Sequence, residues 1–201
     1  IQEGEFSAVF CEVPSNPLLR TVNLPRASEA CRQGGVPLVV DDTVASSVNL
    51  EVLKYADLVT TSLTKWVSGA GDVMAGMVTL NAESPWATEF RSFFSEDTNG
   101  GSRLYSGDCR VLISNMKSYR ERVQRSNENG ELVADYLHEH PAVGRVWYPK
   151  YNTPHEYNLI RRNEGGYGGL VSFTLKQPRR MPKFYDALEL CKGPSLGTDF
   201  T

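Results

Sequence analysis

A lysine set among hydroxyl residues and glycines is the first sign of chemistry in this sequence. Lys65 stands in the run TTSLTKWVSGAGDVMAG, residues 60–76, with Ser62 and Thr64 just before it and three glycines after it. A lysine amine can bond covalently to a carbonyl compound, and hydroxyls and backbone N–H groups can hold a phosphate. The run therefore predicts an amine and a set of phosphate-binding groups in one place.

Two further runs place polar side chains directly after apolar stretches. VPLVVDD, residues 36–42, ends in Asp41 and Asp42, and Asn16 follows FSAVFCEV, residues 6–13. Because ligands of open α/β sheets bind at the carboxyl ends of the strands, we expect these side chains near the lysine.

Pyridoxal phosphate (PLP) is the cofactor that this set of side chains suits. It needs a lysine for its aldehyde, a carboxylate that keeps the ring nitrogen protonated, and hydroxyl and N–H groups for its phosphate. Lys65, Asp41, Ser62 with Thr64, and Asn16 beside the ring oxygen could supply these groups in turn.

Each residue of this set also has an ordinary structural interpretation. A lysine after a strand is usually a solvated surface residue, and Ser62 and Thr64 could be plain strand residues. Asp41 could cap the following turn, and Asn16 in PSNP is typical of a turn. Their coincidence at three strand ends favours a site.

The elements that must position these residues alternate along the first half of the chain. Apolar, β-branched runs predict strands, and Pro25 with Gly34 and Gly35 marks a helix start and end. We expect a parallel or mixed sheet with helices on both faces, an α/β fold. The predicted strands are 6–13, 36–42, 58–63 and 72–80, and the predicted helices are 25–35 and 49–57.

Helical periodicity dominates the middle of the chain, in residues 84–97 and 106–140. HPAVG breaks it, and we place a domain boundary near residue 141, between a domain of residues 1–140 and a smaller α+β domain of residues 141–201. The smaller one is expected to contain a strand at GRVWYP, a helix near 155–163, a glycine hairpin at EGGYGG, a strand at LVSFTLK and a helix at 181–191.

Composition restricts the classes of function. The 201 residues are 40% hydrophobic and 22% charged, with a net charge of −3 and scattered basic residues. Neither nucleic acid nor a membrane is an expected partner. The four cysteines form no CxxC pair, so we expect no metal site and reduced thiols in a cytoplasmic protein. The ends suggest a piece of a longer chain, with no signal peptide at the start.

The sequence resembles the cystathionine γ-synthase family of Cys/Met-metabolism PLP enzymes, fungal members in particular. CEVPSNP resembles the family's E-x-P-x-N-P, VVDDTVAS its V-D-N-T-F-A, and TSLTKWVSGAGDVMAG its S-x-T-K-Y-x-x-G-H-x-D-V-x-x-G. The tract LISNMKSYRERVQRSNENGELVADYLHEHPAVGRVWYP is similar to its interdomain helix and small-domain start, and YGGLVSF and GPSLGTDF follow in order. The resemblance implies the aspartate aminotransferase-like fold type I.

The resemblance also implies a role for each matching residue. Lys65 would bind the cofactor aldehyde and carry protons, and Asp41 would pair with the ring nitrogen. The phosphate would contact Ser62 and Thr64, the ring oxygen Asn16, and the substrate carboxylate Ser195. Family residues that lie outside residues 1–201 complete the site.

Three positions depart from the family pattern. Asp42 replaces an asparagine and adds a carboxyl beside Asp41, Ala70 replaces a common histidine, and Trp66 a common tyrosine. They leave the cofactor roles intact and concern the choice of substrate.

The implied function is trans-sulfuration in methionine biosynthesis and cysteine metabolism. An activated homoserine ester would exchange its γ-substituent for a thiol such as cysteine. A cystathionine γ- or β-lyase and an O-acetylhomoserine sulfhydrylase use the same cofactor residues, and a non-catalytic remnant or scaffold is a third alternative. The family's assembly implies a homotetramer, a dimer of dimers, acting on small-molecule amino acids.

Overall fold

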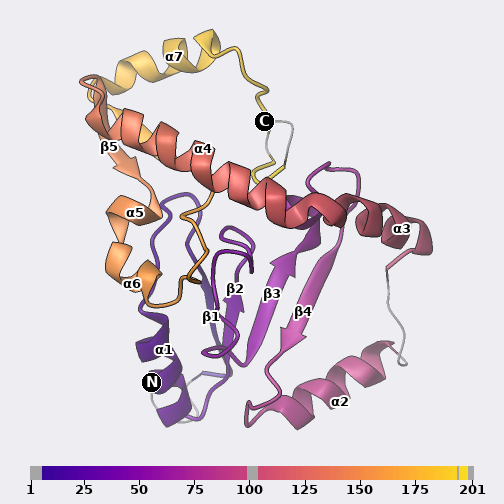
Figure 1. The fold of residues 1–201 in the computed structure, drawn as a ribbon. Coiled ribbons are helices and arrows are strands. Elements are labelled where there is room, and N and C mark those ends of the chain that lie inside the picture. Colours follow the sequence, from indigo (N-terminus) through magenta and orange to yellow (C-terminus); the bar gives the residue numbers. More distant parts are fainter. Residues whose placement is uncertain (1–5, 99–103, 194, 199–201) are drawn as a thin grey trace.

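A four-stranded sheet forms the centre of the protein in the computed structural model, which describes residues 6–98, 104–193 and 195–198 (Figure 1). Neighbouring strands follow the chain, in the order β1-β2-β3-β4. β1 pairs with β2 and β2 with β3 in parallel, whereas β4 is antiparallel to β3. The predicted mixed sheet is confirmed. The strands are β1 Val9–Glu12, β2 Leu38–Asp41, β3 Leu58–Ser62 and β4 Gly76–Leu80.

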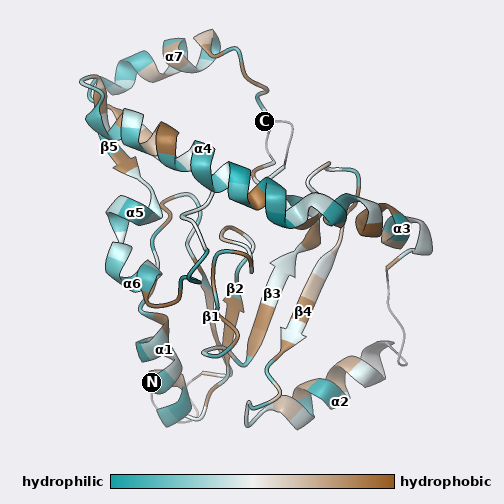
Figure 2. Ribbon diagram, viewed as in Figure 1, coloured by the Kyte–Doolittle hydropathy of each residue, from teal (hydrophilic) through white to brown (hydrophobic). Residues whose placement is uncertain are grey.

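Apolar side chains of this sheet and of α1, Leu24–Gln33, form the main core. The Asn23 side chain accepts a hydrogen bond from the Arg26 N–H and caps the helix, and Pro25 lies in its first turn. Figure 2 shows the apolar residues concentrated in the strands, while the helices are mostly hydrophilic. The core also includes side chains from the turns after β2 and from the segment of Tyr157 and Ile160, so burial of this whole cluster supplies the driving force for the unit.

The helix predicted for residues 49–57 is wrong, because this segment consists of turns. Glu51 donates its backbone N–H to the Ile160 carbonyl at 2.8 Å, and Leu50 forms an isolated antiparallel bridge with Arg161. Pairing with a distant segment thus replaces the local bonds that a helix would need.

Three helices follow the sheet: α2 Ala87–Thr98, α3 Ser106–Asn115 and α4 Tyr119–Glu139. A 3₁₀ turn, Met116–Ser118, divides the helical tract predicted for residues 106–140. The buried residues of α4 recur at helical spacing, at Val123, Asn127, Gly130 and Ala134. α4 runs above the sheet toward β5 in Figure 1. Within the described residues, no helix combines the length and the apolar character needed to cross a bilayer.

A second, two-stranded sheet pairs β5, Val143–Trp147, with β6, Ser172–Leu175, in antiparallel fashion. Between them lie the short helices α5 Pro149–Asn152 and α6 Pro154–Asn158, and α7 Met181–Ala187 follows β6. The domain boundary near residue 141 stays a prediction.

The glycine hairpin expected at EGGYGG is wrong, because no strand of the described chain flanks that run directly. A side chain at Gly166 would place its Cβ 2.4 Å from Asn127 Cγ. The glycine is needed for close approach to α4 and not for a turn.

Candidate active site

The carboxyl ends of β2 and β3 lie at the same edge of the sheet, because the two strands are parallel neighbours. β2 ends at Asp41 and β3 at Ser62. Thr43 links the two ends: its backbone N–H donates to Asp41 Oδ1 at 2.9 Å, and its Oγ1 accepts from the Ser62 N–H at 2.8 Å. A predicted carboxylate and a predicted hydroxyl residue are thus held together.

Lys65 lies in a tight turn that follows β3, Leu63–Ser68, which we name the lysine turn. Its backbone departs from helical geometry at Lys65, with φ −79° and ψ −120°. Gly69 ends the turn at φ +80°, a conformation that favours glycine, and donates its N–H to the Lys65 carbonyl at 2.7 Å. The glycine after the lysine therefore closes the turn.

The Lys65 amine is half-buried and donates to Ser195 Oγ at 2.9 Å. These two residues are 130 positions apart in the chain. The structure therefore brings together the predicted covalent lysine and the predicted substrate-side serine.

Ser62 and Thr64 differ in what their hydroxyls already contact. Thr64 Oγ1 accepts from the Ala75 N–H at 3.0 Å and lies 3.4 Å from the Ala75 carbonyl oxygen. The Ser62 hydroxyl makes no hydrogen bond with any residue that the structure describes. Ser62 is the more available phosphate contact, while Thr64 also ties the lysine turn to the approach to β4.

The two adjacent carboxyls have different surroundings. Asp41 is half-buried, and the structure gives it no ion pair within residues 6–98, 104–193 and 195–198. Asp42 is 2% exposed and accepts from Thr61 Oγ1 at 2.5 Å. Burial raises the pKa of Asp42 most, the Thr61 hydrogen bond opposes that rise, and the charge of Asp41 adds to it. Asp41 is the carboxylate available to a ligand.

Asn16 is exposed in the turn after β1, where its backbone N–H donates to Glu12 Oε2 at 2.9 Å. Its side chain makes no hydrogen bond to the other predicted site residues in the described part of the chain. Its role at the ring oxygen stays a prediction.

Sequence reasoning assigned no role to Thr43 or Arg122. Thr43 follows Asp41 and Asp42 directly, so its place at a strand end was a usable signal. Arg122, on α4, donates to the Trp66 and Val67 carbonyls. In the sequence it is a single basic residue within a helical tract, and such a residue does not indicate a contact of this kind.

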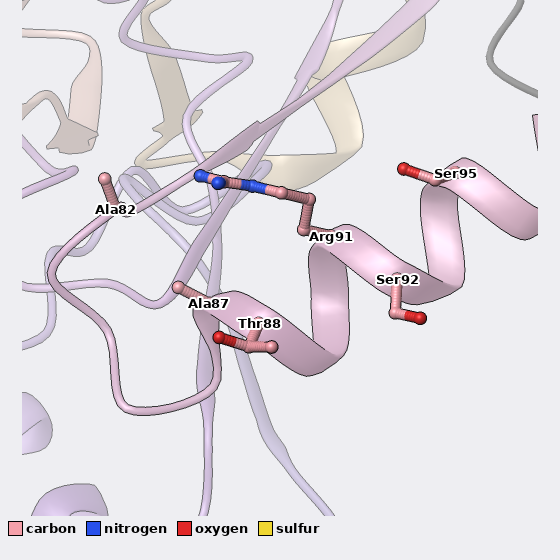
Figure 3. Close-up of a pocket in the computed structure, with 6 residues that line it drawn as sticks. All are labelled: Ala82, Ala87, Thr88, Arg91, Ser92 and Ser95. Atoms are coloured by element: carbon pink, nitrogen blue, oxygen red, sulfur yellow. The ribbon is translucent and has the colours of Figure 1, made fainter.

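The hollow in Figure 3 lies elsewhere, against α2. It has a volume of about 350 Å³, and Arg91 extends across it toward the loop of Ala82. No predicted site residue lines it. The candidate site is therefore defined by the strand ends and the lysine turn.

The groups at the strand ends fit pyridoxal phosphate by their chemistry. Lys65 offers a primary amine for an aldehyde, and Asp41 has a carboxylate oxygen with no hydrogen bond from the described residues. Ser62 contributes a hydroxyl that makes no hydrogen bond within the described ranges of the chain. Lys65 would bind the aldehyde, Asp41 the ring nitrogen and Ser62 the phosphate.

Comparisons with known proteins confirm the family. Residues 1–198 match the family model described as Cys/Met metabolism PLP-dependent enzyme. Cystathionine gamma-synthase of Neurospora crassa is 38% identical over 203 aligned residues, which cover 100% of this chain and 32% of that protein. The chain thus spans about a third of the length of this relative.

Two solved structures share the fold. Cystathionine gamma synthase from Xanthomonas oryzae pv. oryzae, in complex with aminoacrylate and cysteine, superposes with a TM-score of 0.82 at 27% identity, over 96% of this chain and 49% of that one. A methionine gamma lyase from Micromonospora echinospora gives a TM-score of 0.84 at 27% identity, over 98% and 53%. The predicted fold class is confirmed, and the chain belongs to the Cys/Met-metabolism family of PLP-dependent enzymes.

Proposed function

We propose that the protein carrying this chain catalyses γ-replacement, exchanging the γ-substituent of an activated homoserine ester for a thiol such as cysteine. The observation that carries the proposal is the Lys65 amine at the carboxyl end of β3, 2.9 Å from Ser195 Oγ and close in sequence to Ser62. The similarity to the Neurospora cystathionine gamma-synthase supports this reaction.

Pyridoxal phosphate supplies an electron sink that stabilises negative charge at the substrate Cα. Lys65 takes the Cα proton and returns protons later in the cycle, while Asp41 keeps the ring nitrogen protonated. Ser62 holds the phosphate, with Thr64 beside it, and Ser195 orients the substrate carboxylate. We assign Asn16 to the ring oxygen.

Elimination without replacement is the second candidate function. The likeness to a methionine gamma lyase, at a TM-score of 0.84, favours it. Incubation of the protein with O-acetylhomoserine, with and without cysteine, separates the two. Cystathionine that forms only with cysteine supports γ-replacement, whereas 2-oxobutanoate formed equally in both reactions supports a lyase. A sulfhydrylase would instead use sulfide in place of cysteine.

Covalent capture tests whether the site is catalytic or the chain a remnant. The longest natural form of the protein is mixed with pyridoxal phosphate, reduced with borohydride and mapped by mass spectrometry. Label on Lys65, absent from a folded Lys65→Ala control, supports the proposal. A folded protein without label favours the scaffold alternative. We further propose that the protein is cytoplasmic and that it forms a homo-oligomer, a dimer of dimers. Light scattering tests the oligomeric state.

A further inference from the structure

We propose that Arg122 is a positioning residue that fixes the lysine turn against α4 and thereby sets the place of the Lys65 amine. The proposal rests on the function proposed above for Lys65. Arg122 acts through the backbone of the two residues that follow the lysine.

The lysine turn leaves backbone carbonyls in need of donors. A helical turn that stops has carbonyls without partners at its end, and burial makes an unpaired carbonyl costly. Trp66 and Val67 are both buried. Their carbonyls lie just before Gly69, where the chain turns away.

Arg122 supplies those donors with both arms of its guanidinium. Nη1 donates to the Trp66 carbonyl at 2.9 Å, and Nη2 donates to the Val67 carbonyl at 2.9 Å. Nη2 also lies 3.3 Å from the Asn115 carbonyl oxygen, and Nε donates to Ser118 Oγ at 3.1 Å. The planar group is therefore held from both sides, at a geometry that a lysine ammonium cannot reproduce.

Three further hydrogen bonds hold the lysine turn and the chain just after it through their side chains. Asn115 Nδ2 donates to Ser68 Oγ and to Asp72 Oδ1, each at 2.9 Å. The Trp66 indole Nε1 donates to the Val44 carbonyl at 3.0 Å, which attaches the turn to the chain after β2. Residues 66–68 of the lysine turn are thus attached to α3, to α4 and to the loop that follows β2.

This arrangement leaves the Lys65 side chain with one hydrogen bond, to Ser195, among the described residues. The position of its amine then depends on the backbone of its own turn. A displacement of about 1 Å at a reacting group can cost on the order of 100-fold in rate, even when the altered residue lies away from the chemistry.

The test compares Arg122→Lys with Arg125→Lys in the longest natural form of the protein. Arg125 is exposed on the same helix and serves as the matched control. Three quantities are measured: the rate at which pyridoxal phosphate and borohydride label Lys65, kcat and KM separately, and the melting temperature of the cofactor-free protein.

We expect Arg122→Lys to slow labelling of Lys65 and to lower kcat by about 10- to 100-fold, with a smaller change in KM. Arg125→Lys should match the wild type. A folded Arg122→Lys protein with wild-type labelling and kcat overturns the proposal, and so does a lower melting temperature with an unchanged labelling rate.

Ser118→Ala keeps the test decisive if Arg122→Lys does not fold. It removes the bond that orients Arg122 Nε and leaves the lysine turn untouched. Labelling slowed by about 2- to 10-fold is expected, and an unchanged rate overturns the proposal. If the wild type itself is not labelled at Lys65, the proposed function fails; if it is labelled and all variants equal it, this inference alone fails.

Discussion

The lysine turn and the contact between Asn49 and Asn127 use polar residues in opposite ways. Asn49 Nδ2 donates to Asn127 Oδ1 at 2.9 Å, and Asn127 Nδ2 donates back to Asn49 Oδ1 at 2.8 Å. The backbone N–H groups of Gly166 and Gly168 donate to the same two oxygens. We name these four residues the amide junction.

In the amide junction the side chains satisfy one another and the neighbouring backbone, at 1% and 8% exposure. In the lysine turn, by contrast, Arg122 and Asn115 satisfy the surrounding groups, and Lys65 has one hydrogen-bond partner in the part of the chain that the structure describes. Polar residues that hold the fold have their bonding capacity filled by protein. A polar residue that is available for chemistry, such as Lys65, is held in place by neighbours whose own hydrogen bonds are made to the protein.

The largest effect that this comparison predicts is on activity, at Lys65. Lys65→Ala should lower the rate by about 10²–10⁴-fold or more, because it removes the group that moves protons. The melting temperature of the cofactor-free protein should stay close to wild type, because among the described residues Lys65 loses one hydrogen bond, to Ser195. Steady-state kinetics and calorimetry measure the two. A protein of wild-type activity would contradict the assignment.

Asn127→Ala should show the reverse pattern, with a large loss of stability. It removes Asn127 as a partner of the Asn49 amide, which keeps its hydrogen bonds with Ala45 and Gly166. It also removes the acceptor of the Gly168 N–H, so the expected cost is roughly 1–3 kcal/mol in the free energy of unfolding. Urea unfolding measures the loss, and the exposed Asn129→Ala on the same helix is the control. If Asn127→Ala and Asn129→Ala were equally stable, the amide junction would not stabilise the fold, and its contrast with the lysine turn would be wrong.

The buried carboxyl group of Asp42 makes the stability of the protein depend on pH. Its pKa is raised above the ordinary 3.8, chiefly by burial, so the folded protein holds this proton more tightly than the unfolded chain. Wild-type stability should therefore fall as pH rises from 3.8 through the raised pKa.

Asp42→Asn should remove that fall and be more stable than wild type at neutral pH. The amide oxygen can still accept from Thr61. Unfolding measured across the pH range checks this, with the exposed Asp186→Asn as control. If the difference in stability between Asp42→Asn and wild type does not grow as the pH rises, the pKa of Asp42 is not raised in the folded protein.

Ser195→Ala should have the smallest effect. It removes one hydrogen-bond acceptor from Lys65 and one donor from the substrate side, so kcat/KM should fall by about 2- to 10-fold, mainly through KM. Kinetics over a range of substrate concentrations measure it. A loss as large as that of Lys65→Ala would make Ser195 part of the proton-transfer machinery.

Strand ends could be predicted from the sequence because local patterns determine them. Asp41 and Ser62 end runs of buried residues, and the glycine at position 69 follows Lys65 closely. The family motifs added Ser195, whose contact with Lys65 spans 130 positions.

What the sequence did not predict depends on contacts between distant segments. Arg122 reaches Trp66 across 56 positions, and Asn127 reaches Asn49 across 78. The turns at residues 49–57 result from pairing with Ile160 and Arg161, which no local pattern contains. Apolar periodicity reports burial and carries no information about which partner a polar side chain will meet.

The length of α4 makes it a lever. Its 21 residues extend about 30 Å, and the buried Asn127 divides it into two arms. Arg122 lies five residues before this fulcrum, about 7–8 Å along the axis, and the other arm reaches toward β5. A tilt of about 10° around Asn127 would move the guanidinium by about 1 Å. A movement of the second sheet that tilts α4 would therefore displace the hydrogen-bond donors of the lysine turn.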